Sequence, residues 1–284
     1  MGHYDQELNT MTKLFTEQGD SVTSLYQLIE ENPKLEPGEE LDPGQFELLA
    51  PFPDRNILAI GKNYHEHAKE FNKSGFDSSD KTDIPSHPVV FTKNWSCIVP
   101  SGAPVFTHPQ LTSTLDYEGE IAVVIGKKAT RVKREQAMDY VWGYTIVNDV
   151  TARELQRDHK QFFIGKSLDT FGPMGPVAKH KDWLHENQGD LVLQTRVNGE
   201  LRQKGTLNDL IFSIPTLIET LSAGITLNPG DIISTGTPAG VGIGFSTPKY
   251  LKAGDIVEVE VSGIGVLRNV FTDDVLTETV LEHI

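Results

Sequence analysis

Two glutamates at the head of an apolar run could bind a metal ion. Glu118 and Glu120 open the segment EGEIAVVIG. Side chains alternate along a strand, so both carboxylates leave one face, with α-carbons roughly 7 Å apart. Like charges this close are costly unless a divalent cation lies between them, and hard cations prefer oxygen ligands. A solvated strand face carries the same pattern, and Asp116 on the same face could replace either ligand. The residues alone leave both interpretations open.

A third acidic residue follows a second apolar segment. Asp149 ends the run GYTIVND, where an aspartate commonly begins a turn, but as a third oxygen ligand it would complete an all-carboxylate site. Such a site suits Mg²⁺ or Mn²⁺ rather than Zn²⁺. Arg153 and Gln156 come next. On a helical turn their three-residue spacing places them on one face, where they could hold a substrate carboxylate.

The segment GKNYHEHAKE could supply a general base. His67 and Glu70 are three residues apart, so on one helical turn the carboxylate can orient the imidazole to deprotonate a water molecule. His65 and His67 could instead be metal ligands. In isolation an exposed histidine-rich turn is the simpler interpretation.

Two glycine-rich segments carry further polar side chains. Lys166 lies in GKSLDTFGPMGP, which its Gly and Pro content predicts to be a rigid loop, and Thr237 lies in STGTPAGVGIG. The glycines of the second segment let backbone amides approach an anion closely. Gly240, Gly242 and Gly244 superficially match a dinucleotide fingerprint. A proline and an LKAGD turn follow where a long helix should begin, so we exclude a nucleotide site.

Strand signals dominate among the elements that must position these residues. The segments predicted as strands are 56–61, 88–91, 120–126, 144–149, 191–197, 231–235 and 255–261. Asn198 and Gly199 follow the fifth segment and predict a two-residue hairpin. Helices are few, with candidates at residues 134–140 and 213–224.

The first 52 residues are predicted to form a small N-terminal segment, followed by a main catalytic domain over 53–284. A helix in the N-terminal segment is indicated by apolar positions at helical spacing, with two residues before them as caps. The apolar positions are Val22, Leu25, Tyr26 and Ile29, and the caps are Asp20 and Ser21. Residues 33–44, PKLEPGEELDPG, are typical of a surface connection.

The composition excludes several classes of function. The chain has 25 basic and 40 acidic residues, a net charge of −15 that repels nucleic acid and anionic membranes, so we expect neither as a partner. Cys97 is alone, so no internal disulfide or multi-cysteine zinc site can form. No apolar run is long enough for a signal peptide or a membrane span. We expect a cytoplasmic protein, and a mitochondrial location stays open.

Residues 71–87, FNKSGFDSSDKTDIPSH, are the longest stretch of the main body without periodicity. Their Gly, Ser and Asp content cannot supply a core, which is typical of a surface loop. Because the stretch directly follows the histidine-rich segment, it could also be a lid over an active site.

In order and spacing, these segments together resemble the signature blocks of the fumarylacetoacetate hydrolase family. The matching blocks are NYHEHAKE, DYEGEIAVVIG, GYTIVNDVTARELQ, GKSLDTFGPMGP, TGTPAGVG and LKAGDIVEVEVSGIG, which span about residues 55 to 271. The resemblance implies an α+β, mostly β fold, a mixed β-roll, with a short N-terminal segment. That segment is far shorter than the N-terminal domain of true fumarylacetoacetases, which argues against their specific activity.

The resemblance also assigns roles to residues. It implies that one Mg²⁺ or Mn²⁺ ion per subunit is held by Glu118, Glu120 and Asp149. The implied catalytic residues are His67, in preference to His65, together with Glu70 and Lys166. The implied substrate contacts are Tyr64, Arg153, Gln156 and Thr237, and residues 71–87 are implied to be the lid.

The activity implied by the resemblance is metal-dependent hydrolysis of a carbon–carbon bond in a β-diketo acid such as an acylpyruvate, through a metal-bound enolate. Oxaloacetate decarboxylation and the isomerisation or decarboxylation of a hydroxy-dienedioate are alternatives, because they share that enolate. A non-enzymatic dicarboxylate-binding homologue is a further alternative, which loss of the base or of a ligand would indicate, and none is lost. We expect a small keto acid or dicarboxylate as substrate, and a homodimer.

Overall fold

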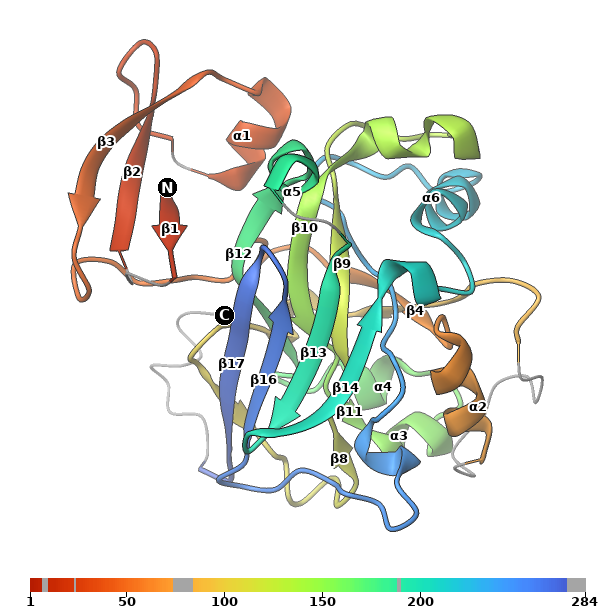
Figure 1. Ribbon diagram of the computed structural model, residues 1–284. Helices are drawn as coiled ribbons and strands as arrows, with labels where there is room; N and C mark the ends of the chain where they lie inside the picture. Colours follow the sequence, from red (N-terminus) through yellow and green to blue (C-terminus); the bar gives the residue numbers. More distant parts are fainter. Residues whose placement is uncertain (7–9, 23, 74–83, 188–189, 275–284) are drawn as a thin grey trace.

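The apolar run that follows Glu120 forms the central strand of the largest sheet. Strand β9 (Gly119–Ile125) is buried along its whole length, as expected for a strand covered on both faces. The computed structural model describes residues 1–6, 10–22, 24–73, 84–187 and 190–274, and it places β9 in the middle of a seven-stranded sheet (Figure 1). The strand order is β5 (Val89–Lys93), β4 (Ile57–Gly61), β15 (Ile232–Ser234), β9, β10 (Val141–Asn148), β12 (Gly172–His180) and β6 (Ile98–Pro100). The five segments predicted as strands in this sheet are confirmed.

A second sheet has five strands and contains the other two predicted segments. Its order is β14 (Glu200–Thr206), β13 (Val192–Val197), β16 (Ile256–Val261), β17 (Gly265–Thr272) and β7 (Pro104–Phe106). The predicted hairpin joins β13 to β14. Asn198 and Gly199 have φ of 52° and 80°, the left-handed conformation that a two-residue hairpin turn requires.

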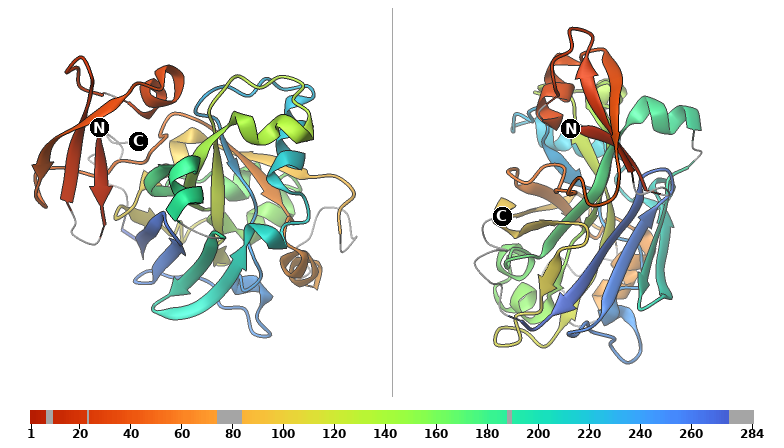
Figure 2. Two further views of the ribbon diagram at one scale, coloured as in Figure 1. Left: turned by 45° about the horizontal axis from the view of Figure 1, so that its top comes forward. Right: turned by 90° about the vertical axis from the view of Figure 1, so that its left-hand side faces the viewer.

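The two sheets face one another and enclose the main core, as the two views of Figure 2 show. Period-two alternation along β9 sends side chains to both faces. Towards the five-stranded sheet it contributes Ile121, Val123 and Ile125. The other face of β9 carries Ala122 and Val124, which join a second cluster of buried residues that includes Phe52 and Ile29. Parallel and antiparallel pairs occur in both sheets, so the expected mixed, mostly β architecture is confirmed.

Short helices lie around the sheets. They are α2 (His65–Lys73), α3 (Arg153–Asp158), α4 (Phe163–Lys166), α5 (Lys181–Asn187) and α6 (Ile214–Ser222). The predicted helix after Ser213 is α6, which has Pro near its start, whereas residues 134–140 form a 3₁₀ helix, η2 (Arg134–Tyr140). Three shorter 3₁₀ turns are η1 (Trp95–Cys97), η3 (Leu207–Asp209) and η4 (Gly242–Gly244). In the part of the chain that the structure describes, no helix has the length and apolar character to span a membrane.

The N-terminal residues form a small sheet that lies outside the main body in Figure 1. It consists of β1 (Gly2–Asp5), β2 (Thr10–Thr16) and β3 (Leu35–Leu41), with α1 (Leu25–Glu31) between β2 and β3. The predicted caps of this helix, Asp20 and Ser21, are wrong, because the hydroxyl of Ser24 accepts the capping hydrogen bond. The expected surface connection at 33–44 contains strand β3, which is mostly exposed but pairs with β2. The division into 1–52 and 53–284 stays a prediction.

The segment around Lys166 also differs from its prediction as a rigid loop. Lys166 ends helix α4, and the Gly- and Pro-rich residues after it run into strand β12. Proline cannot donate a ladder hydrogen bond, and the pairing of β10 with β12 shifts register between Tyr144 and Ile146 to accommodate the sequence. Most of the expected lid, residues 74–83, lies outside the described residues.

Candidate metal centre and active site

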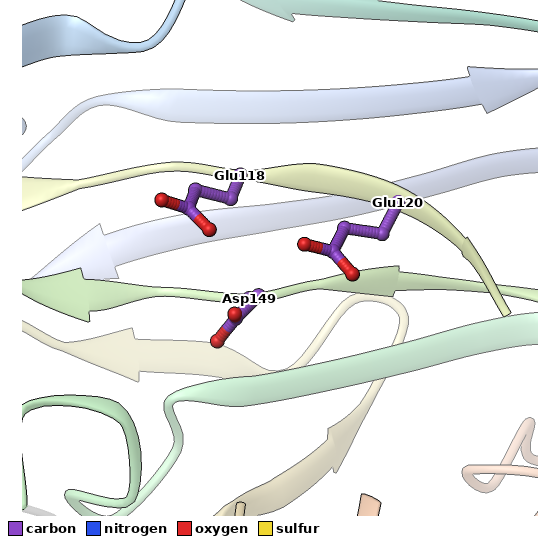
Figure 3. A group of neighbouring side chains, drawn as sticks. All are labelled: Glu118, Glu120 and Asp149. Atoms are coloured by element: carbon purple, nitrogen blue, oxygen red, sulfur yellow. The ribbon is translucent and has the colours of Figure 1, made fainter. Parts of the chain in front are cut away.

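The two neighbouring strands β9 and β10 bring the three predicted carboxylates together. Glu118 and Glu120 point from the same face of β9, as their spacing predicts, and Asp149 follows the last residue of β10 (Figure 3). The Asp149 amide donates a hydrogen bond of 2.8 Å to the Glu118 carbonyl. The same two chain segments pair again beyond the carboxylates, as the short strands β8 (Leu115–Asp116) and β11 (Thr151–Ala152). Carboxylate oxygens of the three residues lie within 4.8 Å of one another, and all three residues are buried.

The three carboxylates sit in unequal electrostatic surroundings. Burial alone would raise the pKa of Glu118, but Lys166 and Arg153 outweigh it and hold the pKa well below its usual range. Among the described residues, the hydrogen-bond donors to Glu120 are the Ser234 hydroxyl, at 2.6 Å, and the Gly236 amide. Burial, and then the charges of Asp149 and Glu118, raise the pKa of Glu120 to about 8. A positive charge is therefore needed beside Glu120 if all three groups are to be ionised together.

These residues fit a hard divalent cation. Asp149 Oδ1 lies 2.7 Å from Lys93 Nζ, yet it accepts no well-aligned hydrogen bond from any described residue. Three carboxylates without histidine or cysteine form an oxygen donor set, which Mg²⁺ and Mn²⁺ prefer. Asp116 is not a substitute ligand. Its two oxygens accept hydrogen bonds from the amides of Gly242 and Ile243 and from Arg153.

Two lysines flank the carboxylates. Lys166 Nζ bridges Glu118 Oε2 at 2.8 Å and Asp149 Oδ2 at 2.7 Å. Burial alone would lower the pKa of Lys166, but these two carboxylates raise it above its ordinary value, so the amine is charged. Lys93 lies behind Asp149 and donates to the backbone carbonyls of Lys166 and Val150. Lys93 therefore ties Asp149 to the backbone that carries Lys166.

Arg153 and Gln156 lie on one face of α3, as predicted, and both are buried. The Arg153 guanidinium pairs with Asp116 Oδ2 at 2.9 Å and with Glu118 Oε1 at 2.7 Å. It also donates to Gln156 Oε1 at 3.2 Å. A guanidinium binds carboxylates through donors in a fixed planar arrangement. These partners therefore fix the orientation of the Arg153 side chain.

Helix α2 carries the predicted base. His67 Nδ1 and Glu70 Oε2 are 3.3 Å apart, and His67 is buried whereas His65 is exposed. The hydrogen bond at Nδ1 leaves Nε2 as the nitrogen that can exchange a proton with a substrate or water. Phe71 stacks on the His67 ring, with centroids 6.1 Å apart, and so holds it from one side.

A pocket with an empty volume of about 310 Å³ joins these groups. Its lining residues are Ile60, Gly61, Lys62, His67, Phe71, Phe91, Glu118, Glu120, Arg153, Gln156, Phe162, Lys166 and Thr237. The predicted residues Thr237 and Gln156 are thus at the site, but Tyr64 is not in the lining, and its buried hydroxyl has no hydrogen-bond partner among the described residues.

Comparison with known proteins identifies this arrangement. The family model for the C-terminal region of fumarylacetoacetate (FAA) hydrolase matches residues 56–272, which include all of the pocket. The chain belongs to the fumarylacetoacetate hydrolase family. The six sequence blocks that resemble this family therefore indicated it correctly.

Several named members of the fumarylacetoacetate hydrolase family are similar to the chain. The oxaloacetate tautomerase YisK of Bacillus subtilis is 57% identical over 219 residues, which cover 77% of this chain and 70% of YisK. The structure of a fumarylacetoacetate hydrolase from psychrophilic Exiguobacterium antarcticum covers 93% of this chain and 99% of its own, with a TM-score of 0.77 and 38% identity. A 5-carboxymethyl-2-hydroxymuconate delta-isomerase from Mycobacterium smegmatis covers 96% and 93%, with a TM-score of 0.74 and 31% identity. These relatives are enzymes named for different reactions, and the fold of the family is confirmed.

Sequence reasoning missed several residues of this family site. Lys62 lines the pocket, Lys93 holds Asp149, and Gln203 donates to Thr237 Oγ1 at 2.7 Å. Lys93 had a readable signal, since it is a single lysine at the end of the apolar segment VVFTK. Gln203 had none, because β14 is an alternating, mostly exposed strand in which a buried amide looks like any other polar position.

Proposed function

We propose that the protein catalyses keto–enol interconversion of oxaloacetate, or of a very similar 2-oxo dicarboxylate, with a divalent cation held by Glu118, Glu120 and Asp149. The observation that carries this proposal is the set of three cationic side chains, Lys62, Arg153 and Lys166, that line one small pocket beside the carboxylates. The named activity of YisK supports the same reaction.

The charges of the site support an acidic substrate. The three cations of the lining lie beside three candidate ligand carboxylates, Lys93 and Asp116 add one charge of each sign, and the Glu70 carboxylate beside His67 adds a further negative charge. A divalent cation would therefore leave a net positive charge in a buried place, where uncompensated charge is costly. A carboxylate substrate offsets this charge.

The side chains can divide the work of tautomerisation. Arg153 and Gln156 would hold the carboxylate next to the keto group, and Lys62, which also lines the pocket, would attract the second carboxylate. His67, oriented by Glu70, would take the proton from C3. Lys166 would deliver a proton to the keto oxygen, and in the reverse direction both transfers run backwards.

When bound, the divalent cation would stabilise negative charge that develops on the keto or enol oxygen. The ammonium of Lys166, bonded to two of the carboxylate ligands, is placed to stabilise the same charge. Phe71, Phe91 and Phe162 line the pocket and reduce its access to water, which strengthens these charge interactions.

Hydrolysis of an acylpyruvate is the second candidate. The observation that favours it is the His67–Glu70 pair, because such a pair can deprotonate a water molecule for attack on a carbonyl carbon. Oxaloacetate decarboxylation requires mainly the charge stabilisation and no positioned base. The three reactions therefore make different demands on His67.

A substrate panel tests the proposal. The purified protein with Mg²⁺ or Mn²⁺ would be given enol-oxaloacetate, keto-oxaloacetate and an acylpyruvate, with loss of enol absorbance, release of pyruvate and cleavage of the acylpyruvate followed separately. We expect the enol–keto conversion to be the fastest. Acylpyruvate cleavage without acceleration of the conversion above the metal-only blank would assign the second candidate instead.

The metal requirement has its own test. Chelation should abolish turnover, and added Mg²⁺ or Mn²⁺ should restore it. Glu118→Gln should weaken Mn²⁺ binding measured by calorimetry, since it removes one ligand charge, whereas Glu135→Gln on the surface turn η2 should not. Full turnover by chelated protein with no detectable metal would contradict the proposed cation site.

A further inference from the structure

The glycine-rich turn at 240–244 binds two carboxylates of the protein itself. The Gly240 amide donates to both carboxylate oxygens of Glu70, at 3.1 and 3.2 Å. The amides of Gly242 and Ile243 donate to Asp116, at 2.6 and 3.0 Å. Successive backbone amides in such a turn form a concave anion site. The turn that superficially matches a nucleotide fingerprint therefore holds internal anions.

The turn also leaves no room for a side chain at Gly244 while Glu70 is in place. A Cβ at Gly244 would lie 1.8 Å from Glu70 Oε1 and 2.0 Å from its Cδ. Gly244 itself is exposed, and its backbone conformation is one that alanine also adopts. The absence of a side chain at this position therefore leaves room for the approach of Glu70.

We propose that the 240–244 turn is the seat on which α2 docks, and that docking of Glu70 there sets the position of His67. Glu70 is the point of contact, since Oε2 also lies 3.3 Å from His67 Nδ1. Of the helices and strands described, α2 packs mainly against η4 in this turn. The inference rests on the proposed function only in taking His67 as the residue that moves a proton.

The same seat aligns a second group. Asp116, held by the amides of Gly242 and Ile243, accepts a hydrogen bond from Arg153 Nε and forms an ion pair with the guanidinium. One rigid turn therefore fixes both the proton-transferring imidazole, through Glu70, and the guanidinium that faces the substrate, through Asp116. Displacing Glu70 separates these two effects, because the three atoms nearest to a Cβ at Gly244 all belong to Glu70.

Gly244→Ala tests the seat. It should push Glu70 away and lower kcat by on the order of tenfold to a hundredfold, because small displacements of a catalytic group have effects of this size. KM for oxaloacetate and the affinity for Mn²⁺ should stay within about twofold of the wild type, since neither Arg153 nor the metal ligands move. The matched control is Gly224→Ala, where an added Cβ meets nothing within 4 Å.

A double-substitution cycle shows whether the effect passes through Glu70. Gly244→Ala in a Glu70→Gln background should reduce kcat no further, whereas independent effects would multiply. Hydrogen exchange over residues 65–73 reports docking without any substrate, and Gly244→Ala should accelerate it while Gly224→Ala should not.

Unchanged exchange in Gly244→Ala, multiplying effects in the cycle, or an equal loss of Mn²⁺ affinity would each overturn the seat. Absence of oxaloacetate turnover in the wild type would instead overturn the proposed function, and the exchange experiment would still decide the seat.

Discussion

Asp149 is held between two ammonium groups, and this arrangement makes Lys93 a structural counterpart of Lys166. Lys93 is fully buried, and its contacts join a metal-ligand candidate to two backbone carbonyls. Removing one partner of a buried ion pair leaves an uncompensated charge, which is strongly destabilising.

Lys93→Met should therefore lower the free energy of unfolding by roughly 3–5 kcal/mol. Urea denaturation with and without Mn²⁺ measures the effect. Lys128→Met, at an exposed position, is the control and should change stability little. A Lys93→Met protein as stable as the control would show that the pair contributes no net stability.

The two histidines of α2 give the second prediction at this scale. His67→Ala should reduce turnover by on the order of a hundredfold or more, because it removes a positioned base. His65→Ala should be mild, since His65 is exposed. Both variants should bind Mn²⁺ like the wild type. If His65→Ala were inactive and His67→Ala nearly normal, the base would be His65 and its assignment to His67 would be wrong.

At the residue level, period-two and period-three spacings predicted shared faces for Glu118 with Glu120 and for His67 with Glu70, and the family resemblance added Asp149; the structure brings these groups together. The sequence could not predict Lys93, Gln203 or the seat for Glu70. Those contacts join segments more than thirty residues apart, and no local pattern encodes such a pairing.

At the scale of elements, helix α3 is anchored at its first turn by its own Glu154. The carboxylate accepts hydrogen bonds from the hydroxyls of Thr112, Ser113 and Thr114, and from the Ser113 amide at 3.2 Å. Partial burial alone would raise the pKa of Glu154, but these hydrogen bonds lower it to about 2. The helix that carries Arg153 is thereby tied to the segment that precedes the first metal-ligand candidate.

This anchoring predicts a specific acid sensitivity. Because the folded-state pKa of Glu154 lies below its unfolded value of about 4.3, its contribution is present above that value and is lost as pH falls towards 2. The stability of the wild type should therefore fall more steeply between pH 5 and 3 than that of Glu154→Gln. Urea midpoints of both proteins at pH 7, 5 and 3 measure this, and parallel curves would contradict it.

The elements themselves were predictable where burial is two-sided or alternating, as in β9 and β13. Strands were not predictable where the local composition disfavours a strand and only pairing with a neighbouring strand stabilises it. Strand β12 contains Pro173 and Pro176, and β3 reads LEPGEEL with nearly every residue exposed, so each is a strand only because a neighbouring strand pairs with it.

At the scale of the whole molecule, Cys97 reports on the integrity of the core. It is fully buried in the main cluster, and burial raises the pKa of its thiol to about 11. Thiolate is the reactive form, so the native protein should react with a disulfide reagent at pH 8 orders of magnitude more slowly than the urea-unfolded chain. One thiol per chain should react after unfolding, and rapid reaction of the folded protein would contradict the burial.

The expected homodimer is also a property of the whole molecule. Among the described residues, β5 is an edge of the seven-stranded sheet, and exposed apolar side chains lie on it and on the adjoining η1 and α4. They are Val90, Trp95, Phe163 and Ile164. Because an apolar edge favours association, we predict that sedimentation gives twice the chain mass and that Trp95→Lys with Phe163→Lys gives the monomer. A wild-type monomer would exclude this assembly.

The placement of the site has a consequence for how the protein can evolve. Two of the candidate metal ligands, Glu118 and Glu120, lie at the head of a strand that is packed on both faces, where almost any substitution disturbs the core. The candidate base His67 lies instead on a short helix outside the two sheets. We therefore expect descendants to change residues of α2 more readily than the candidate cation site, and the different reactions for which the relatives are named agree with this expectation.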